Sequence, residues 1–222
     1  FKLKRDMRGR SFIQQLVHNM MIKITSFTSH KLLFSSEITK SEYIKFNNIS
    51  NHKNLYVIEN GVDIKRFSKG NKLAISELDK KKFFLSVSQI YRLKNFDNLI
   101  KSYLKFERHE GGEIKLVIVG TVQEEDYFAK LKAISSVSEN IIFLHNISDS
   151  ELNWLYKNCE IYILLSYFEG FSLTPAEAIC SGKNVILSDI NVHRNIYNGL
   201  AEFANPSSVD SIYKAILNRE KN

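Results

Sequence analysis

The sequence predicts an α/β protein built on a doubly wound parallel sheet. Short apolar runs recur along the chain, and the run IYILLS at residues 161–166 is rich in branched and aromatic side chains. Strands that are buried on both faces of a parallel sheet have this composition. Amphipathic stretches with helical spacing separate the runs, and the loops between them are short. This alternation favours right-handed crossovers within one parallel sheet.

The first eighty or so residues are less regular. Residues 11–28 predict one amphipathic helix, because their apolar side chains recur at helical spacing. The stripe consists of Phe12, Leu16, Met20, Ile24 and Phe27. A strand at 31–36, a small helix at 41–46 and a strand at 55–60 are predicted next. Residues 68–82 are lysine-rich without an extended apolar element, so we expect linker or surface there.

From residue 82 onward strands and helices alternate. The predicted strands are 83–88, 114–120, 140–146, 161–166 and 184–189. The predicted helices are 96–108, 125–134, 148–158 and 174–181. The first of these helices has Phe96, Leu99, Ile100, Tyr103 and Leu104 on one side. The sequence FANP predicts a loop at 203–206, and a final helix follows at 208–220.

The stretch from Ile161 to Asp189 organises the rest of the chain. A buried strand is followed by a glycine-containing loop, a short helix that ends at Gly182, and a second buried strand. Thr174 fits the N-cap of the helix, and Glu177 falls three residues later, as in a capping box. Pro175 suits the first helical position. A loop that leads into a helix at the carboxyl end of a parallel strand is a common site for anionic ligands.

Composition narrows the class of protein. The chain has 222 residues, of which 44% are hydrophobic, and no apolar run reaches the roughly 20 residues that span a bilayer. The first ten residues resemble neither a signal peptide nor a natural start, so we expect a fragment. Cys159 and Cys180 have no disulfide or metal-ligand spacing. We expect both to be small buried hydrophobes in a reducing cytoplasm.

The formal net charge is +7, and five of the first ten residues are Lys or Arg. We do not expect a nucleic-acid partner, because the chain contains no nucleic-acid-binding module. Three explanations for the charge stay open: a solvated basic face, contact with an anionic membrane surface, and a phosphorylated substrate.

Several polar residues follow predicted strands. Lys94, with Gln89 and Arg92 nearby, comes after the strand at 83–88, where cations can hold a diphosphate. The alternative is that these cations are only solvated. Gly120 ends the strand at 114–120 and would allow a ligand to approach the backbone closely. No G-x-G-x-x-G, G-x-S-x-G, Walker or H-E-x-x-H motif occurs.

Other candidates have simpler explanations. Asp149-Ser150-Glu151 resembles a helix cap more than a metal site, so no dedicated metal is expected. His193 is expected at the surface. Glu169 is a loop carboxylate, which is usually solvated. Glu177 has a structural explanation as a capping-box residue, although a carboxylate there could equally accept hydrogen bonds from a sugar or ribose hydroxyl.

Glu169 and Glu177 lie within EGFSLTPAEAICSG, which resembles the E-x7-E signature of family 4 retaining glycosyltransferases. These enzymes have the two-domain GT-B fold, whose C-terminal half is Rossmann-like. Five more blocks resemble the family in the same order, at 57–67, 83–100, 114–120, 141–166 and 188–197. The resemblance covers roughly residues 25–217 and rests on the order of the blocks as well as on the signature.

The resemblance implies that residues 59–222 bind a nucleotide-sugar donor and that residues 1–58 are the end of a partial acceptor domain. Glu169 would contact sugar hydroxyls, and Glu177 would hold the ribose. Lys94 would neutralise the diphosphate, with Arg92 as a second cation. Further donor contacts are implied for Gly61, Gln89, Gly120, Ile147, Gly170, Phe171, Ser172, Leu173 and Thr174. Backbone amides of residues 171–173 would reach sugar and phosphate, and the loop around Ile147 would meet the nucleobase.

The chain departs from the family pattern at several positions. Ser88-Gln89 replaces a usual Gly-Arg pair, and we expect Arg92 to substitute for the missing arginine. Ser172 replaces a glycine, and its side chain would narrow the donor site unless it bonds the ligand. Asn195 stands where an acidic residue is common. Because most of the acceptor domain is absent, we expect the chain by itself to bind donor poorly and not to transfer.

The expected function is therefore transfer of a sugar, with retention and without a cofactor or essential metal, to a glycan or lipid-linked acceptor. Surface polysaccharide or glycolipid synthesis would place the protein in the cytoplasm, peripheral to the inner membrane face. Two alternatives stay open. One is a related GT-B nucleotide-sugar epimerase, against which the ordered blocks argue. The other is a non-catalytic nucleotide-sugar-binding subunit, which Gln89 and Ser172 make credible.

Overall fold

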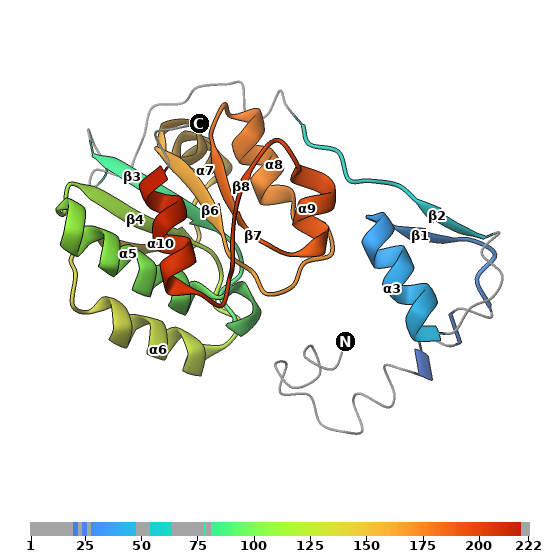
Figure 1. Ribbon diagram of the computed structural model, residues 1–222. Coiled ribbons are helices and arrows are strands. Elements are labelled where there is room, and N and C mark those ends of the chain that lie inside the picture. The colour runs from blue at the N-terminus through green and yellow to red at the C-terminus, as the bar shows by residue number, and fades with distance from the viewer. Residues whose placement is uncertain are drawn as a thin grey trace. The chain divides into compact units, whose positions relative to one another are not determined.

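The computed structural model describes residues 20–21, 24–25, 28–47, 54–63, 78 and 81–218. Within it the chain divides into two compact units, Phe1–Asn60 and Gly61–Asn222 (Figure 1). Each unit is described by itself below. None of the helices in the described ranges is long and apolar enough to cross a membrane.

The first unit contains a two-stranded parallel sheet and a helix. Strands β1 (Leu32–Phe34) and β2 (Leu55–Val57) pair, and helix α3 (Glu37–Asn47) connects them. The side chain of Ser36 accepts a hydrogen bond from the amide of Thr39 at 3.1 Å, which is why α3 begins four residues before the predicted helix.

The apolar stripe predicted in residues 11–28 is only partly described. Met20, Met21, Ile24, Thr25 and Thr28 are helical, as expected. Met20 and Ile24 are 58% and 50% exposed. The other stripe members, Phe12, Leu16 and Phe27, lie outside the described residues, as does the basic segment 1–10.

The second unit is built on a six-stranded parallel sheet in the order β5-β4-β3-β6-β7-β8 (Figure 1). The strands are β3 (Lys82–Val87), β4 (Ile114–Val119), β5 (Ile141–Leu144), β6 (Ile161–Leu164), β7 (Val185–Ser188) and β8 (Glu202–Ala204). The order reverses between β3 and β6, which are neighbours although two other strands separate them in sequence. This arrangement is the doubly wound fold that the sequence predicted.

Helices cover both faces of this sheet. One face packs against α5 (Phe96–Glu110), α6 (Glu125–Ser135) and α10 (Val209–Leu217). The other packs against α7 (Asp149–Asn158), α8 (Leu173–Cys180) and α9 (Asn191–Tyr197) (Figure 1). In β6, Ile161 and Ile163 face the first group and Tyr162 and Leu164 face the second. Because both faces are covered, the strands read as unbroken apolar runs rather than alternating ones.

Most elements match the predicted ranges to within a few residues, and the cap at Asp149-Ser150-Glu151 is confirmed. Ser148 Oγ accepts from the amide of Glu151, and the carboxylate of Glu151 accepts from the amide of Ser148 at 2.7 Å. The burial of one face of α5 is also confirmed, and Phe106 belongs to it as well.

Four predictions about the fold are wrong. Helix α9 was not expected, and β8 lies partly within the predicted loop FANP, because both elements are too short to show a period. Leu78, placed in the expected surface linker, is fully buried in the core on the α7 and α8 face. Cys159 is buried as expected, but Cys180 is exposed, since it ends the short helix α8.

Candidate functional site

The reversal of strand order places the candidate site at the carboxyl ends of β3 and β6. The chain leaves β3 toward α5 on one face of the sheet and leaves β6 toward α8 on the other. Loops that diverge in this way leave a crevice outside the sheet edge, where ligands of doubly wound proteins bind. The loop after β3 carries Gln89, Arg92 and Lys94, and the loop after β6 carries residues 165–172.

Lys94 and Glu169 meet across this crevice. The ammonium Nζ of Lys94 lies 2.7 Å from Oε1 of Glu169, although 75 residues separate them in sequence. The two side chains are only 13% and 10% exposed. Neither is therefore the solvated surface charge that was the alternative explanation for each. The Nζ atom of Lys94 also lies 5.6 Å from the centre of the Tyr91 ring.

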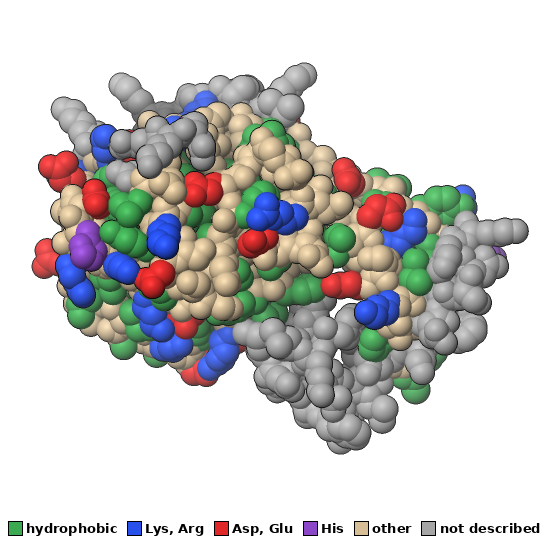
Figure 2. All heavy atoms as spheres, viewed as in Figure 1, with side chains coloured by type: hydrophobic (Ala, Val, Ile, Leu, Met, Phe, Trp, Pro, Cys, Tyr) green, Lys and Arg blue, Asp and Glu red, His purple; other side chains and the backbone are tan. Residues whose placement is uncertain are grey.

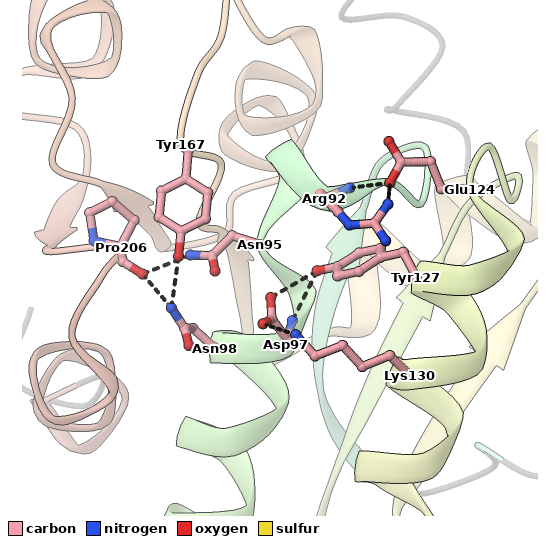
Figure 3. Close-up of polar contacts among 9 residues, drawn as sticks. All are labelled: Arg92, Asn95, Asp97, Asn98, Glu124, Tyr127, Lys130, Tyr167 and Pro206. Carbon is pink, nitrogen blue, oxygen red and sulfur yellow. Dashed lines mark hydrogen bonds and ion pairs between the residues drawn. The ribbon is translucent and has the colours of Figure 1, made fainter. Parts of the chain in front are cut away.

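A hydrogen-bond network fastens three loops of this edge together (Figure 3). The buried Asn95 side chain donates to the carbonyl oxygens of Leu165 at 3.0 Å and Pro206 at 2.7 Å. Asn98 donates to Pro206 and to the hydroxyl oxygen of Tyr167, both at 3.0 Å. Loops after β3, β6 and β8 are thus joined directly beside Lys94. Asn95 was not singled out from the sequence, since a single asparagine carries no signal of such distant partners.

Arg92 lies in the same 3-10 turn as Lys94, Arg92–Lys94, but has different partners. Its guanidinium pairs with the carboxylate of Glu124 and lies 5.8 Å from the centre of the Tyr127 ring (Figure 3). It also pairs with the carboxylate of Asp126 at the start of α6. Hydrogen bonding from Arg92 holds the pKa of Asp126 below its usual value. Within the described residues, the ion pairs of Arg92 therefore tether the loop to α6 rather than reaching Lys94 or Glu169.

The predicted capping box at the start of α8 is wrong. The helix begins at Leu173 with Ser172 as N-cap, and the Ser172 side chain makes no capping bond. Thr174 Oγ1 lies 2.7 Å from the hydroxyl of the fully buried Tyr162, which competes for it. The carboxylate of Glu177 accepts a hydrogen bond from Tyr156 at 2.8 Å. Pro175 accordingly lies at the third helical position, not the first.

This correction changes what the first turn of α8 can do. The first amides of a helix have no intrahelical partners and carry a partial positive charge. No acidic side chain lies in the first turn of α8, and the N-cap side chain is turned elsewhere. The turn follows the loop that holds Glu169, and because Pro175 has no N–H, the amides that it offers to an anion are those of Leu173 and Thr174.

Ser172 has an unusual backbone conformation. Its φ is 72°, in the left-handed region that residues with a side chain seldom adopt. Its carbonyl oxygen accepts a hydrogen bond from the hydroxyl of Tyr197, and its Oγ lies 3.4 Å from Nε2 of His193. His193, expected at the surface, is fully buried, because α9 turns it into the protein. Burial lowers the pKa of His193 below its usual value.

A side chain at Gly120 is excluded by the neighbouring loop. A Cβ at this position would lie 1.8 Å from the carbonyl oxygen of Ser88. The close approach is therefore made by the loop after β3, which runs against the end of β4. The amide of Ser88 donates to the carbonyl of Val119 at 2.9 Å, which continues the pairing of the two strands.

The remaining candidates are distributed around the same edge, with one exception. Gln89 is exposed beside Lys94, and half-buried Gly170 and nearly buried Phe171 follow Glu169. Leu173 is 41% exposed, and Ile147 follows β5 and packs partly into the core. Gly61 is exposed at the beginning of the second unit.

In the described residues, neither a group of metal ligands nor the cavity lined by Ile161, Val185 and Glu202 lies at this edge. Within the described residues no three His, Cys, Asp or Glu side chains are grouped as metal ligands would be. A cavity of about 340 Å³ lies at the opposite edge, where Ile161, Val185 and Glu202 begin β6, β7 and β8. On the face shown in Figure 2, Lys and Arg side chains are interspersed with Asp and Glu rather than gathered in one basic patch.

Comparisons with known proteins bear on the family and the fold of the chain. The family model "Glycosyl transferases group 1" matches residues 50–222. The chain is 29% identical over 214 residues to the O-antigen chain mannosyltransferase RfbU of Salmonella typhimurium, covering 95% of this chain and 57% of RfbU.

A second relative is the N,N'-diacetylbacillosaminyl-diphospho-undecaprenol alpha-1,3-N-acetylgalactosaminyltransferase of Campylobacter jejuni. It is 24% identical over 229 residues, which cover 97% of this chain and 58% of that protein. The chain therefore spans a little over half the length of these curated relatives.

Among solved structures, Anabaena HepE in complex with UDP and glucose superposes with a TM-score of 0.76 at 16% identity. The match covers 90% of this chain and 56% of HepE. It confirms the expected α/β fold, in which a Rossmann-like parallel sheet is typical of one half of a GT-B protein. A small two-stranded sheet precedes this sheet in the sequence.

Proposed function

Because the chain belongs to the group 1 glycosyl transferases, we propose that it is the donor-binding part of a retaining glycosyltransferase. The enzyme would transfer a sugar from a nucleotide-diphosphate sugar to a glycan or lipid-linked acceptor. Residues 59–222 would bind the donor, and residues 1–58 would be the end of the acceptor domain.

The observation that supports this function best is the Lys94–Glu169 pair at the reversal of strand order. An ammonium and a carboxylate lie 2.7 Å apart, nearly buried, in the crevice where doubly wound proteins bind nucleotides. A nucleotide-sugar brings groups that suit both side chains, because its diphosphate attracts the cation and its sugar hydroxyls donate to the carboxylate.

The two charges would exchange partners when the donor binds. Lys94 would turn its ammonium to the diphosphate, and Glu169 would accept hydrogen bonds from the sugar hydroxyls in return. The amides of Phe171, Ser172 and Leu173 would add donors at the start of α8. Glu177, held by Tyr156 and free of a capping role, would accept from the ribose.

The same groups would stabilise the transition state. Departure of the nucleotide leaves negative charge on phosphate, and a preorganised ammonium and helix amides stabilise that charge without reorganisation. The leaving phosphate can accept the proton of the acceptor hydroxyl, so the proposed reaction needs neither a protein base in this unit nor an essential metal. Arg92 would act indirectly by holding the turn that presents Lys94.

The acceptor and the location are proposed from the relatives. One relative is named for an O-antigen chain and another for a diphospho-undecaprenol lipid. We accordingly propose synthesis of a surface polysaccharide or glycolipid at the cytoplasmic face of a membrane. Basic residues in segment 1–10 would contact anionic lipid there.

The test is an assay of the complete protein with a panel of nucleotide-sugars and lipid-linked or glycan acceptors. We expect release of nucleoside diphosphate together with a glycosylated product of retained configuration, established by NMR of the new linkage. If the protein bound a nucleotide-sugar but neither transferred nor hydrolysed any sugar, the proposal would be wrong in favour of a non-catalytic donor-binding subunit.

A further inference from the structure

Two side chains of α9 converge on Ser172. His193 and Tyr197 are four residues apart and so lie on one face of the helix. The Tyr197 hydroxyl donates to the carbonyl oxygen of Ser172, and Nε2 of His193 lies 3.4 Å from Ser172 Oγ. The two rings are 6.2 Å apart. One residue of the loop is thus held through both its backbone and its side chain.

Ser172 needs such support. Three non-glycine residues in the described ranges have a positive φ, namely Asn95, Asn146 and Ser172. Asparagine tolerates the left-handed conformation better than most residues with a side chain, whereas serine has no such advantage. A residue in a sparsely populated conformation persists only where its surroundings impose it, and such residues gather at functional sites.

The contacts of His193 determine where its proton lies. Its Nδ1 is 3.1 Å from the carbonyl oxygen of Ser188 and 3.0 Å from Ser188 Oγ. A carbonyl oxygen only accepts hydrogen bonds, so the contact with the Ser188 carbonyl favours hydrogen on Nδ1, and a neutral ring then presents the lone pair of Nε2 to Ser172. Burial lowers the pKa of the ring and so favours its neutral form, and Lys94 acts in the same direction, while the hydrogen bond to the Ser188 backbone and the charge of Glu169 oppose it. The hydroxyl of Ser172 then donates its proton to Nε2.

We propose that His193 and Tyr197 are positioning residues that hold Ser172 left-handed and so aim the amides of residues 171–173 at the sugar donor. The inference rests on the proposed function of this loop. It has a chemical consequence, because His193 takes the only proton of the Ser172 hydroxyl. Ser172 Oγ therefore meets the ligand as an acceptor, which suits a hydroxyl or N–H group of the donor sugar and not a phosphoryl oxygen.

The first experiment needs no ligand. Long-range ¹H–¹⁵N NMR of the 222-residue chain, with the His193 signals assigned from the His193→Gln variant, reports which ring nitrogen carries hydrogen. We expect the Nδ1–H tautomer at neutral pH. The Nε2–H tautomer or a charged ring would overturn the proposal, whatever the chain binds.

The second experiment measures UDP and GDP affinity by NMR titration, which also detects weak binding. We expect His193→Leu to weaken binding of the better nucleotide at least fivefold, and His193→Gln, which keeps an acceptor for Ser172, less than twofold. In a Ser172→Gly background, where glycine adopts the conformation without support, His193→Leu should change affinity less than twofold. Equal losses in both backgrounds would mean that His193 only fills space, and would overturn the proposal.

Tyr197→Phe tests the other contact and has a matched control. It should weaken nucleotide binding at least threefold, because the Ser172 carbonyl loses its tether. Tyr103→Phe also removes a bond from a buried tyrosine hydroxyl to a backbone carbonyl, that of Ile114, but on the α5 face at the opposite sheet edge. It should leave binding unchanged. If neither the unsubstituted chain nor the complete protein bound a nucleoside diphosphate, the proposed function would be at fault, and the tautomer would still decide the positioning role.

Discussion

The loops at the two ends of the parallel strands, called here the amino edge and the carboxyl edge of the six-stranded sheet, use different residues at their left-handed backbone positions. At the amino edge, the tight turns before β4, β7 and β8 use Gly111, Gly182 and Gly199, all with positive φ. Glycine adopts this conformation without steric strain. The amides of Gly111 and Gly182 donate to carbonyl oxygens of the preceding helices, and a methyl group added at any of the three glycines would meet no atom within 4 Å.

At the carboxyl edge the left-handed positions are filled by residues with side chains. Asn95 follows β3, Asn146 follows β5 and Ser172 follows β6. Two of them are held by specific contacts, since Asn95 donates to two carbonyls and Ser172 is held from α9. The contrast teaches that this protein keeps conformational strain at the edge where the nearly buried Lys94–Glu169 pair lies.

The largest effect expected at the carboxyl edge is the loss of transfer rate in Lys94→Ala. It removes the ammonium proposed to stabilise the leaving phosphate, so the transfer rate of the complete protein should fall about 10²–10³-fold. The check is a rate measurement with saturating nucleotide-sugar. Lys105→Ala is the control, because Lys105 forms an exposed ion pair with Asp210 on the α5 and α10 side. A rate within twofold of the unsubstituted enzyme would remove Lys94 from the site.

The next largest effect is a loss of stability, which we compare for one glycine at each edge. Gly120→Ala would place a methyl group 1.8 Å from the Ser88 carbonyl oxygen, so the loop that presents Lys94 must move. The free energy of unfolding should fall by about 3 kcal/mol. Gly182→Ala meets no atom and is strained only by its φ of 76°, so it should cost about 1 kcal/mol. Urea unfolding of both variants checks the order, and equal losses would contradict it.

A smaller effect separates binding from stability at Glu177. In Glu177→Gln the amide oxygen can still accept from Tyr156, and the side chain caps no helix. The free energy of unfolding should therefore change by less than about 0.5 kcal/mol, because the substitution breaks no buried hydrogen bond. Affinity for the nucleotide-sugar should fall about tenfold, or ~1.4 kcal/mol, if the carboxylate holds the ribose. Calorimetric titration and thermal unfolding separate these quantities, and a lower melting temperature with unchanged affinity would contradict the ribose role.

The smallest expected effect is a pH dependence that comes from His193. Its pKa is lowered from the usual 6.5 by burial, so the unfolded chain takes up a proton at a higher pH than the folded chain does. The stabilisation that comes from the neutral His193 ring is complete above the pKa that the ring has in the unfolded chain. As pH falls below that value, the stabilisation is lost by at most about 1.4 kcal/mol per pH unit. The carboxylates with lowered pKa values, such as Asp97 and Asp189, titrate below this window.

Urea unfolding at about pH 7 and about pH 5 measures this contribution. The unsubstituted chain should lose about 1 kcal/mol more than His193→Gln across this interval. The same loss in both chains would show that other groups cause it.

Much of the fold could be predicted because the signals are local. The apolar run at 161–166 and the helical stripe of α5 depend on side chains a few residues apart, and both lie where expected. The cap at Ser148 and Glu151 is also local, and it formed. Lys94 was singled out by its place after a strand, and the resemblance to a family gave it and Glu169 roles in donor binding. Their ion pair was not predicted, since no spacing relates residues 75 positions apart.

The similar cap at Thr174 and Glu177 did not form, and the reason is tertiary. Tyr162 and Tyr156 come from β6 and α7, which are packed against α8, and their buried hydroxyls form hydrogen bonds with Thr174 and Glu177. Ser148 and Glu151 lie at an exposed helix start, where they bond to each other.

By itself the sequence determined the order of strands and helices, and with it the sheet edge at which polar loop residues would gather. Local periodicity is sufficient for this, because each buried strand or amphipathic helix must cover its own apolar side chains. The tertiary structure alone decided which polar groups meet. It paired Lys94 with Glu169, assigned Arg92 to α6 and buried His193 behind Ser172. These partners come from distant elements, and a buried polar group takes whichever partner the packing brings within reach.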